Sequence, residues 1–133
     1  MKKDHHGSCH CGAVTFDVTL DLDEPTSRCN CSMCSKARFW KAVVPAGAFR
    51  LTGSEHHIAE YTFGGGNIHH RFCRTCGVKV FGTGELPETG AFVAINVLAL
   101  DDVSPEELAA IPVFFEDGRH DRWEAEPAVT SYL

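Results

Sequence analysis

Hydrophobic and polar side chains alternate most regularly over residues 13–20, where Val14, Phe16, Val18 and Leu20 share one face. A repeat of two residues that includes β-branched side chains predicts a half-buried β-strand. Five further runs have strand-like patterns and are separated by turn segments rich in glycine, proline or asparagine. These further predicted strands are residues 38–44, 57–63, 67–73, 78–82 and 91–97.

One short helix is predicted near the end of the chain. Ser104 is placed to cap its N-terminus, Pro105 suits the first helical position, and Glu107 completes a capping box. The helix continues to Ile111, and Pro112 ends it. The sequence therefore predicts a mainly β protein of mostly antiparallel sheets with one short helix.

Length and composition predict one ordinary globular domain over residues 1–133, with 44% hydrophobic and 23% charged residues. The formal charge of −6 argues against binding to nucleic acid, which needs a basic face. The longest nearly apolar stretch, residues 92–100, is shorter than the roughly 20 residues of a membrane-spanning helix. With no signal-peptide pattern, we expect a cytoplasmic protein without membrane contact. No particular oligomeric state is predicted.

The seven cysteines are the most informative feature of the sequence. Their number is odd, and each lies within two or three residues of another. Disulfide frameworks use an even number of more widely spread cysteines, whereas clustered thiols in a reducing compartment indicate a metal such as zinc. The three clusters are Cys9 and Cys11; Cys29, Cys31 and Cys34; and Cys73 and Cys76.

The spacing favours a division of the cysteines into four and three. The two outer pairs each supply half a tetrahedron, so together they predict a closed structural zinc site. The middle cluster predicts a tripod of thiolates with one open position, which is typical of a catalytic zinc. Spacing alone also allows two mixed quartets. One joins Cys31 and Cys34 to Cys9 and Cys11, and the other joins them to Cys73 and Cys76.

Other chemical interpretations have weaker support. Cys73 and Cys76 could form a redox pair, but such pairs usually open a helix in a βαβ unit, which the pattern does not predict. The doublets His56-His57 and His69-His70 are interpreted as partly exposed strand residues rather than as metal ligands.

The cysteine motifs resemble those of the glutathione-dependent formaldehyde-activating enzyme (GFA) family, which includes centromere protein V. The similarity extends over nearly the whole chain and rests on residues 7–14 (GSCHCGAV), 29–34 (CNCSMC) and 72–77 (FCRTCG). It implies a zinc-stapled β-tent fold with two zinc ions per chain. The structural ion would be held by Cys9, Cys11, Cys73 and Cys76. The catalytic ion, which could be labile, would be held by Cys29, Cys31 and Cys34.

The resemblance also implies carbon–sulfur lyase activity. Its partners would be a small-molecule thiol and an aldehyde: glutathione and formaldehyde would condense reversibly to S-hydroxymethylglutathione. Asn30 and Ser35 stand where the middle motif of the family commonly has His and Arg. These differences bear on whether glutathione is the thiol substrate, and they leave the zinc ligands unchanged. Lys36, Arg38 and His10 are candidates for holding the carboxylates of the thiol or moving a proton.

A non-enzymatic zinc-scaffolded binding module is the alternative hypothesis, because a fold does not fix a function. The coordination of a metal at the tripod distinguishes the enzyme hypothesis from the binding-module hypothesis. An open fourth position at Cys29, Cys31 and Cys34 favours an enzyme, and a fourth protein ligand such as a histidine would favour a binding module.

Overall fold

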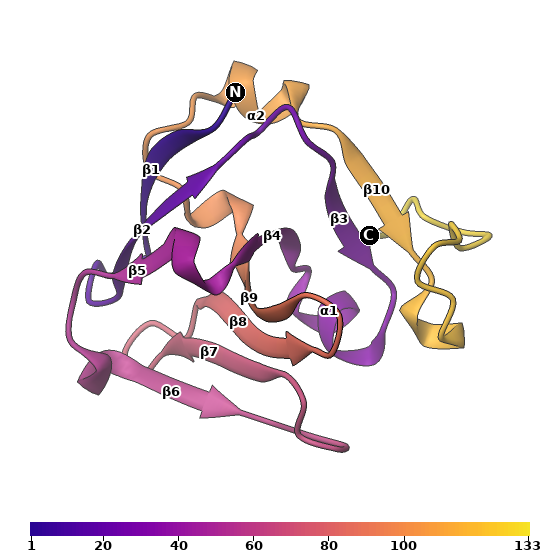
Figure 1. Ribbon diagram of the computed structural model, residues 1–133, viewed down its shortest axis with the longest axis horizontal. Helices are drawn as coiled ribbons and strands as arrows, with labels where there is room; N and C mark the ends of the chain where they lie inside the picture. Colours follow the sequence, from indigo (N-terminus) through magenta and orange to yellow (C-terminus); the bar gives the residue numbers. More distant parts are fainter.

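The computed structural model describes residues 1–133, which form ten β-strands and two short α-helices (Figure 1). The helices are α1 (Ser32–Ala37) and α2 (Pro105–Ala110). The strands are β1 (Lys3–Ser8), β2 (Thr15–Leu20), β3 (Thr26–Cys29), β4 (Trp40–Pro45), β5 (Phe49–Leu51), β6 (Ile58–Tyr61), β7 (His69–Cys73), β8 (Lys79–Leu86), β9 (Gly90–Asn96) and β10 (Val113–Glu116). Neither helix is long and apolar enough to cross a membrane.

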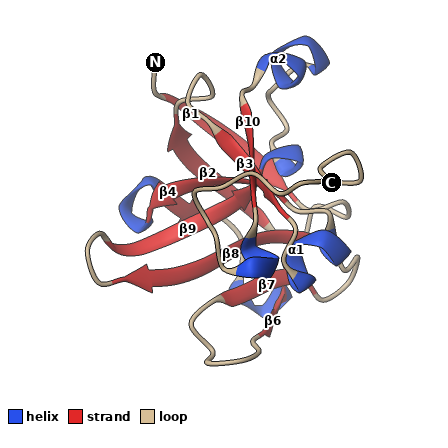
Figure 2. Ribbon diagram, turned by 90° about the vertical axis from the view of Figure 1, so that its right-hand side faces the viewer, coloured by secondary structure: helices blue, strands red, loops and turns tan.

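The strands form two sheets that are held together by a shared core. The smaller sheet has the order β1-β2-β5, and the larger has the order β10-β3-β4-β9-β8-β7-β6. In Figure 1, β1 and β2 form one slope and β3 and β10 the other, and the slopes meet near α2. Figure 2 shows α1 and α2 at well-separated places in the molecule.

The core lies between the two sheets and includes a column of aromatic rings. Phe16 of β2 stacks on Phe49 of β5 with centroids 5.3 Å apart, and Phe49 contacts Phe81 of β8 at 4.7 Å. The regular alternation along β2 explains this arrangement, because Phe16, Val18 and Leu20 all point inward and are buried. Burial of these side chains positions the small sheet against the large one.

Most of the predicted secondary structure is confirmed. Each of the six predicted strand segments corresponds to one strand of the structure, and the protein is mainly β. These strands are β2, β4, β6, β7, β8 and β9. The predicted helix is α2, and its capping box is complete. Ser104 Oγ accepts from the Glu107 N–H at 3.1 Å, and the Ser104 N–H donates to the Glu107 carboxylate at 3.2 Å.

The expectation of a single short helix is wrong. A second helix, α1, begins directly after Cys31, and it has no buried residue, so no periodic hydrophobic pattern marks it. The sheets are mostly antiparallel, as predicted, and only β10 and β3 pair in parallel. The strands β1, β3, β5 and β10 were not predicted, since they are short or rich in polar residues. β5 and β10 acquire strand structure by pairing with β2 and β3, which lie far away in sequence.

Candidate metal centres

The first cluster of thiols joins the two sheets. Cys9 directly follows β1, while Cys73 ends β7 on the large sheet. Cys11 Sγ lies 3.7 Å from Cys9 Sγ and 3.6 Å from Cys73 Sγ. With Cys76, the four sulfur atoms all lie within 4.8 Å of one another. The two outer cysteine pairs therefore meet at one point, although 61 residues separate them in sequence.

This arrangement of thiols suits a tetrahedral zinc ion. With Zn–S bonds of about 2.3 Å, tetrahedral geometry requires sulfur atoms roughly 3.8 Å apart, close to the two distances above. Backbone N–H groups also favour the thiolate form. The Cys76 N–H donates to Cys73 Sγ at 3.4 Å, and Thr75 N–H does so at 3.3 Å; together they lower the pKa of Cys73.

Tight turns present these sulfur atoms. The Gly77 N–H donates to the Cys73 carbonyl at 3.0 Å, and Gly77 has φ of +77°, which an L side chain rarely adopts. Gly12 has φ of +82° in the turn that carries Cys11. Both glycines directly follow a cysteine of the cluster, as the motif Cys-Gly suggests.

The second cluster contains Cys29, Cys31 and Cys34, whose sulfur atoms also lie within 4.8 Å of one another. Cys29 ends β3, and Cys31 caps the N-terminus of α1, where its sulfur accepts from the Cys34 N–H at 3.3 Å. Arg38 ends the helix in a left-handed conformation, and the Phe39 N–H donates to the Cys34 carbonyl at 3.1 Å. The short helix thus folds three nearby cysteines into one tripod.

The tripod favours ionisation of Cys31 and has no fourth protein ligand. Hydrogen bonds from the Cys29 and Cys34 thiols, with the Cys34 and Met33 N–H groups, lower the pKa of Cys31. No His, Asp or Glu joins the three sulfur atoms. The structure therefore groups the seven cysteines four and three, and neither mixed quartet forms.

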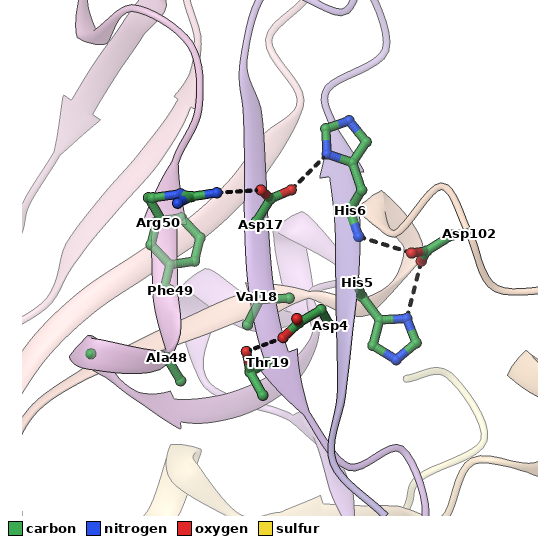
Figure 3. Close-up of a pocket in the computed structure, with 11 residues that line it drawn as sticks. Asp4, His5, His6, Asp17, Val18, Thr19, Ala48, Phe49, Arg50 and Asp102 are labelled. Atoms are coloured by element: carbon green, nitrogen blue, oxygen red, sulfur yellow. Dashed lines mark hydrogen bonds and ion pairs between the residues drawn. The ribbon is translucent and has the colours of Figure 1, made fainter.

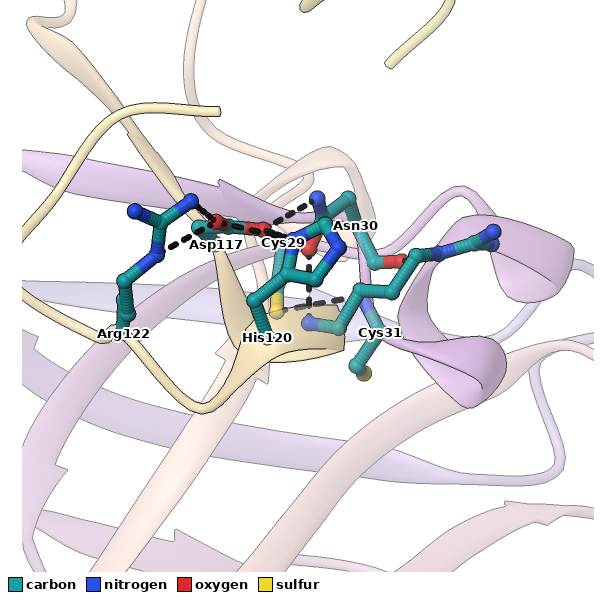
Figure 4. Close-up of polar contacts among 7 residues, drawn as sticks. Cys29, Asn30, Cys31, Asp117, His120 and Arg122 are labelled. Carbon is teal, nitrogen blue, oxygen red and sulfur yellow. Dashed lines mark hydrogen bonds and ion pairs between the residues drawn. The ribbon is translucent and has the colours of Figure 1, made fainter. Parts of the chain in front are cut away.

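A buried polar network fixes the peptide between Cys29 and Cys31 (Figure 4). Asn30 Nδ2 donates to Asp117 at 2.8 Å, and Asn30 Oδ1 accepts from the Arg119 N–H at 2.9 Å. Asp117 is completely buried, and it also accepts from His120 and Arg122 at 2.9 and 2.8 Å.

This network lowers the pKa of Asp117, and the loop that holds Asp117 lies over the second cluster. The hydrogen bond from Asn30, aided by His120 and Arg122, lowers the pKa of Asp117 to about 2. The loop that holds Asp117 also covers Cys29, since a Cβ on Gly118 would lie 2.5 Å from Cys29 Sγ. The sequence pattern did not indicate Asp117, because it lies 87 residues from Asn30 and shares no motif with it.

Of the three polar candidates from the sequence, only Arg38 lines the small pocket that Cys29 and Cys34 border. His10 is exposed in the turn of the first cluster, and Lys36 is exposed on α1. Arg38 donates to the Tyr132 carbonyl at 3.3 Å.

The expectation that the histidine doublets lie at least partly exposed is wrong for one member. His70 is 6% exposed, and its Nδ1 lies 2.8 Å from Lys79 Nζ. Sequence reasoning missed Lys79 altogether, because no motif includes it.

A separate hollow of about 460 Å³ lies on the small sheet (Figure 3). Its polar side chains are mostly paired with one another. His6 and Arg50 contact Asp17 at 3.0 and 2.8 Å, and His5 contacts Asp102 at 3.0 Å. The hollow contains no cysteine and is not part of either cluster.

Comparisons with known proteins place the chain among relatives. The sequence model of the family "Glutathione-dependent formaldehyde-activating enzyme" matches residues 4–117, which contain all seven cysteines. A Halomonas elongata protein named "Putative glutathione-dependent formaldehyde-activating enzyme" is 57% identical over 30 residues, which are 23% of this chain. The match spans only 19% of that relative's length.

A solved structure shows the same fold over most of the chain. The crystal structure of a Rhodobacter sphaeroides protein superposes with a TM-score of 0.69 and 30% sequence identity. The match covers 82% of this chain and 99% of the other. With the family match over residues 4–117, these findings establish that the chain belongs to the glutathione-dependent formaldehyde-activating enzyme family.

Proposed function

We propose that this protein is a zinc-dependent carbon–sulfur lyase. It would add a thiol such as glutathione to formaldehyde or a related aldehyde, reversibly, to give an S-hydroxymethyl adduct. The observation that carries the proposal is the tripod of Cys29, Cys31 and Cys34, which offers three sulfur ligands and no fourth protein ligand. Membership of the family supports the choice of reaction.

Two zinc ions per chain suit the two clusters. Cys9, Cys11, Cys73 and Cys76 form a closed set of four, which is typical of a structural site whose binding energy contributes to folding. The tripod would hold the second ion. Zinc held by three thiolates supplies a soft Lewis acid that accepts a thiol as fourth ligand and lowers its pKa.

The proposed reaction is balanced without an oxidant or a further reactant. The thiol loses its proton, its sulfur forms a bond to the carbonyl carbon, and the carbonyl oxygen gains a proton. The reverse reaction breaks the same carbon–sulfur bond. Because both reactants are small, holding them side by side accounts for part of the acceleration.

The chain's own residues have distinct tasks in this scheme. The tripod cysteines hold the reacting centre, and the Asn30–Asp117 hydrogen bond fixes the peptide that carries Cys29 and Cys31. All seven cysteines are free thiols, which suits a reducing compartment such as the cytoplasm. One buried cluster of 18 residues contains side chains from both sheets, which supports treating residues 1–133 as one domain.

NMR exchange spectroscopy on formaldehyde and glutathione tests the proposal. We expect the zinc-loaded protein to accelerate exchange with S-hydroxymethylglutathione. Cys31→Ser should remove the acceleration, because it removes one tripod ligand. Lys3→Ala is the control: it changes an exposed residue of β1, on the sheet that does not carry the tripod, and should keep the full rate.

If the wild-type protein leaves the exchange rate at its uncatalysed value, the lyase proposal is wrong. A zinc-scaffolded binding module would then be the better description.

A further inference from the structure

Lys79 is a partly buried cation without an acidic partner. Its Nζ donates to His70 Nδ1 at 2.8 Å and lies 4.0 Å from the centroid of the Phe39 ring. Burial lowers the pKa of Lys79, and negative charge on the Cys34 and Cys31 sulfur atoms opposes this effect. An ammonium group has three N–H donors, so the two contacts leave one N–H free. By contrast, the Lys41 ammonium is paired with the Glu116 carboxylate.

His70 supplies a second unused donor. Its Nδ1 accepts from the Lys79 ammonium, which places the ring proton of neutral His70 on Nε2. His70 is only 6% exposed, yet Nε2 has no hydrogen-bond partner in the protein. A buried donor without a partner is costly, and such groups in native proteins call for an explanation such as a ligand.

The fold brings these donors to the tripod. A register shift between Arg71 and Phe72 places Lys79 opposite Phe72, so that Lys79 can reach His70. β7 and β8 pass close to α1 in both ribbon views (Figure 1, Figure 2). Phe39 connects the two regions, because its backbone N–H donates to the Cys34 carbonyl and its ring contacts Lys79.

Aromatic side chains border the donors. Phe63 stacks on the His70 ring with centroids 5.6 Å apart, and Tyr61 lies 5.8 Å from Phe63. Phe63 and Tyr61 are about half exposed, so this border faces solvent. Cationic and N–H donors beside apolar rings suit a carboxylate that is attached to an organic molecule.

We propose that Lys79 and His70 form a carboxylate subsite for the thiol whose sulfur binds at the tripod. The inference rests on the proposed function and narrows the substrate class to thiols that carry a carboxylate. Lys79 Nζ and His70 Nε2–H donate to the carboxylate, while the free sulfur of the same molecule reaches the open side of Cys29, Cys31 and Cys34.

The test compares glutathione with its diethyl ester, which keeps the thiol but lacks both carboxylates. Dissociation constants are measured by NMR titration of the zinc-loaded protein, with zinc content determined for every variant. We expect wild type to bind glutathione at least about tenfold more tightly than the ester, as charge-assisted hydrogen bonds typically allow. Lys79→Met should bring the ratio close to one, and Lys79→Arg should restore part of it.

Lys3→Met is the control, because it removes an exposed positive charge from β1 on the small sheet, away from the tripod, and should leave the ratio unchanged. Equal binding of the two thiols by wild type overturns the subsite alone, provided that formaldehyde exchange is still accelerated. If neither thiol binds and exchange is not accelerated, the proposed function fails as well. Loss of the tripod zinc in Lys79→Met would show that Lys79 only balances thiolate charge, and would overturn the subsite.

Discussion

The two cysteine clusters should contribute very differently to stability. A metal held by Cys11 and Cys73 cross-links residues 62 positions apart and connects the two sheets. The unfolded chain has no preformed site of this kind, so metal binding favours the folded state. The tripod cysteines lie within six residues, so they remain a chelate even in the unfolded chain, and their metal discriminates less between the two states.

The separation of Cys11 and Cys73 allows an estimate of the magnitude. Closing a loop of 62 residues corresponds to about 4 kcal/mol of chain entropy at room temperature. For 133 residues the unfolding entropy is about 0.28 kcal/mol per degree. Removing the cross-link should therefore lower Tm by about 15 °C.

Thermal unfolding followed by circular dichroism tests this estimate. Cys11→Ser is the suitable variant, because Cys11 is exposed and the new hydroxyl is not buried. We expect Cys11→Ser to lower Tm by about 15 °C, and Cys31→Ser to lower it by less than about 5 °C. Metal analysis should find one zinc fewer in each variant. His10→Ala, in the same turn as Cys11, should leave both Tm and zinc content unchanged.

Two results would refute the reasoning. A Tm for Cys11→Ser within about 5 °C of wild type would show that the first cluster does not staple the sheets. If Cys31→Ser lowers Tm as much as Cys11→Ser does, the tripod is a structural site. Removing zinc from wild type with a chelator empties both clusters, so it should lower Tm at least as far as Cys11→Ser does.

Three further predictions concern packing and pH. Gly118→Ala places a Cβ 2.5 Å from Cys29 Sγ, so it should lower the free energy of unfolding by about 1–3 kcal/mol and weaken tripod zinc in chelator competition. Gly47→Ala, which meets no atom within 4 Å, is its control. Phe16→Ala removes a fully buried ring and should cost about 3–5 kcal/mol in urea unfolding; a smaller loss would contradict the role of the aromatic column. Because the pKa of Asp117 is held at about 2, below its unfolded value of about 4, its ionised carboxylate stabilises the fold above pH 4, and this contribution is lost as pH falls towards 2. The difference in unfolding free energy between wild type and Asp117→Asn should therefore shrink from pH 5 to pH 3, and a difference independent of pH would contradict this explanation.

The candidate sites show which features a sequence pattern can reveal. The two cysteine pairs and the tripod cluster were visible because each occupies a few consecutive residues. The helix α1 was not visible, because all of its side chains are at least partly exposed and its N-terminus is capped by a thiol. Asp117 and Lys79 were missed for another reason. The role of Asp117 depends on Asn30, which is distant in sequence, and the role of Lys79 depends on His70, with which it shares no motif.

By itself the sequence determined what short-range physics can specify. Alternation along residues 13–20 fixed the inward face of β2, the capping box fixed the start of α2, and glycines after Cys11 and Cys76 set the turns that present sulfur. Only the tertiary structure decided which cysteine pairs meet. Ligand spacing constrains residues within one turn of the chain, whereas packing of the two sheets brings Cys11 and Cys73 to 3.6 Å across 62 positions. Packing also decides that the tripod has no fourth protein ligand. Any residue of the chain could in principle fold against the three sulfur atoms, so only the complete structure shows that no further ligand does.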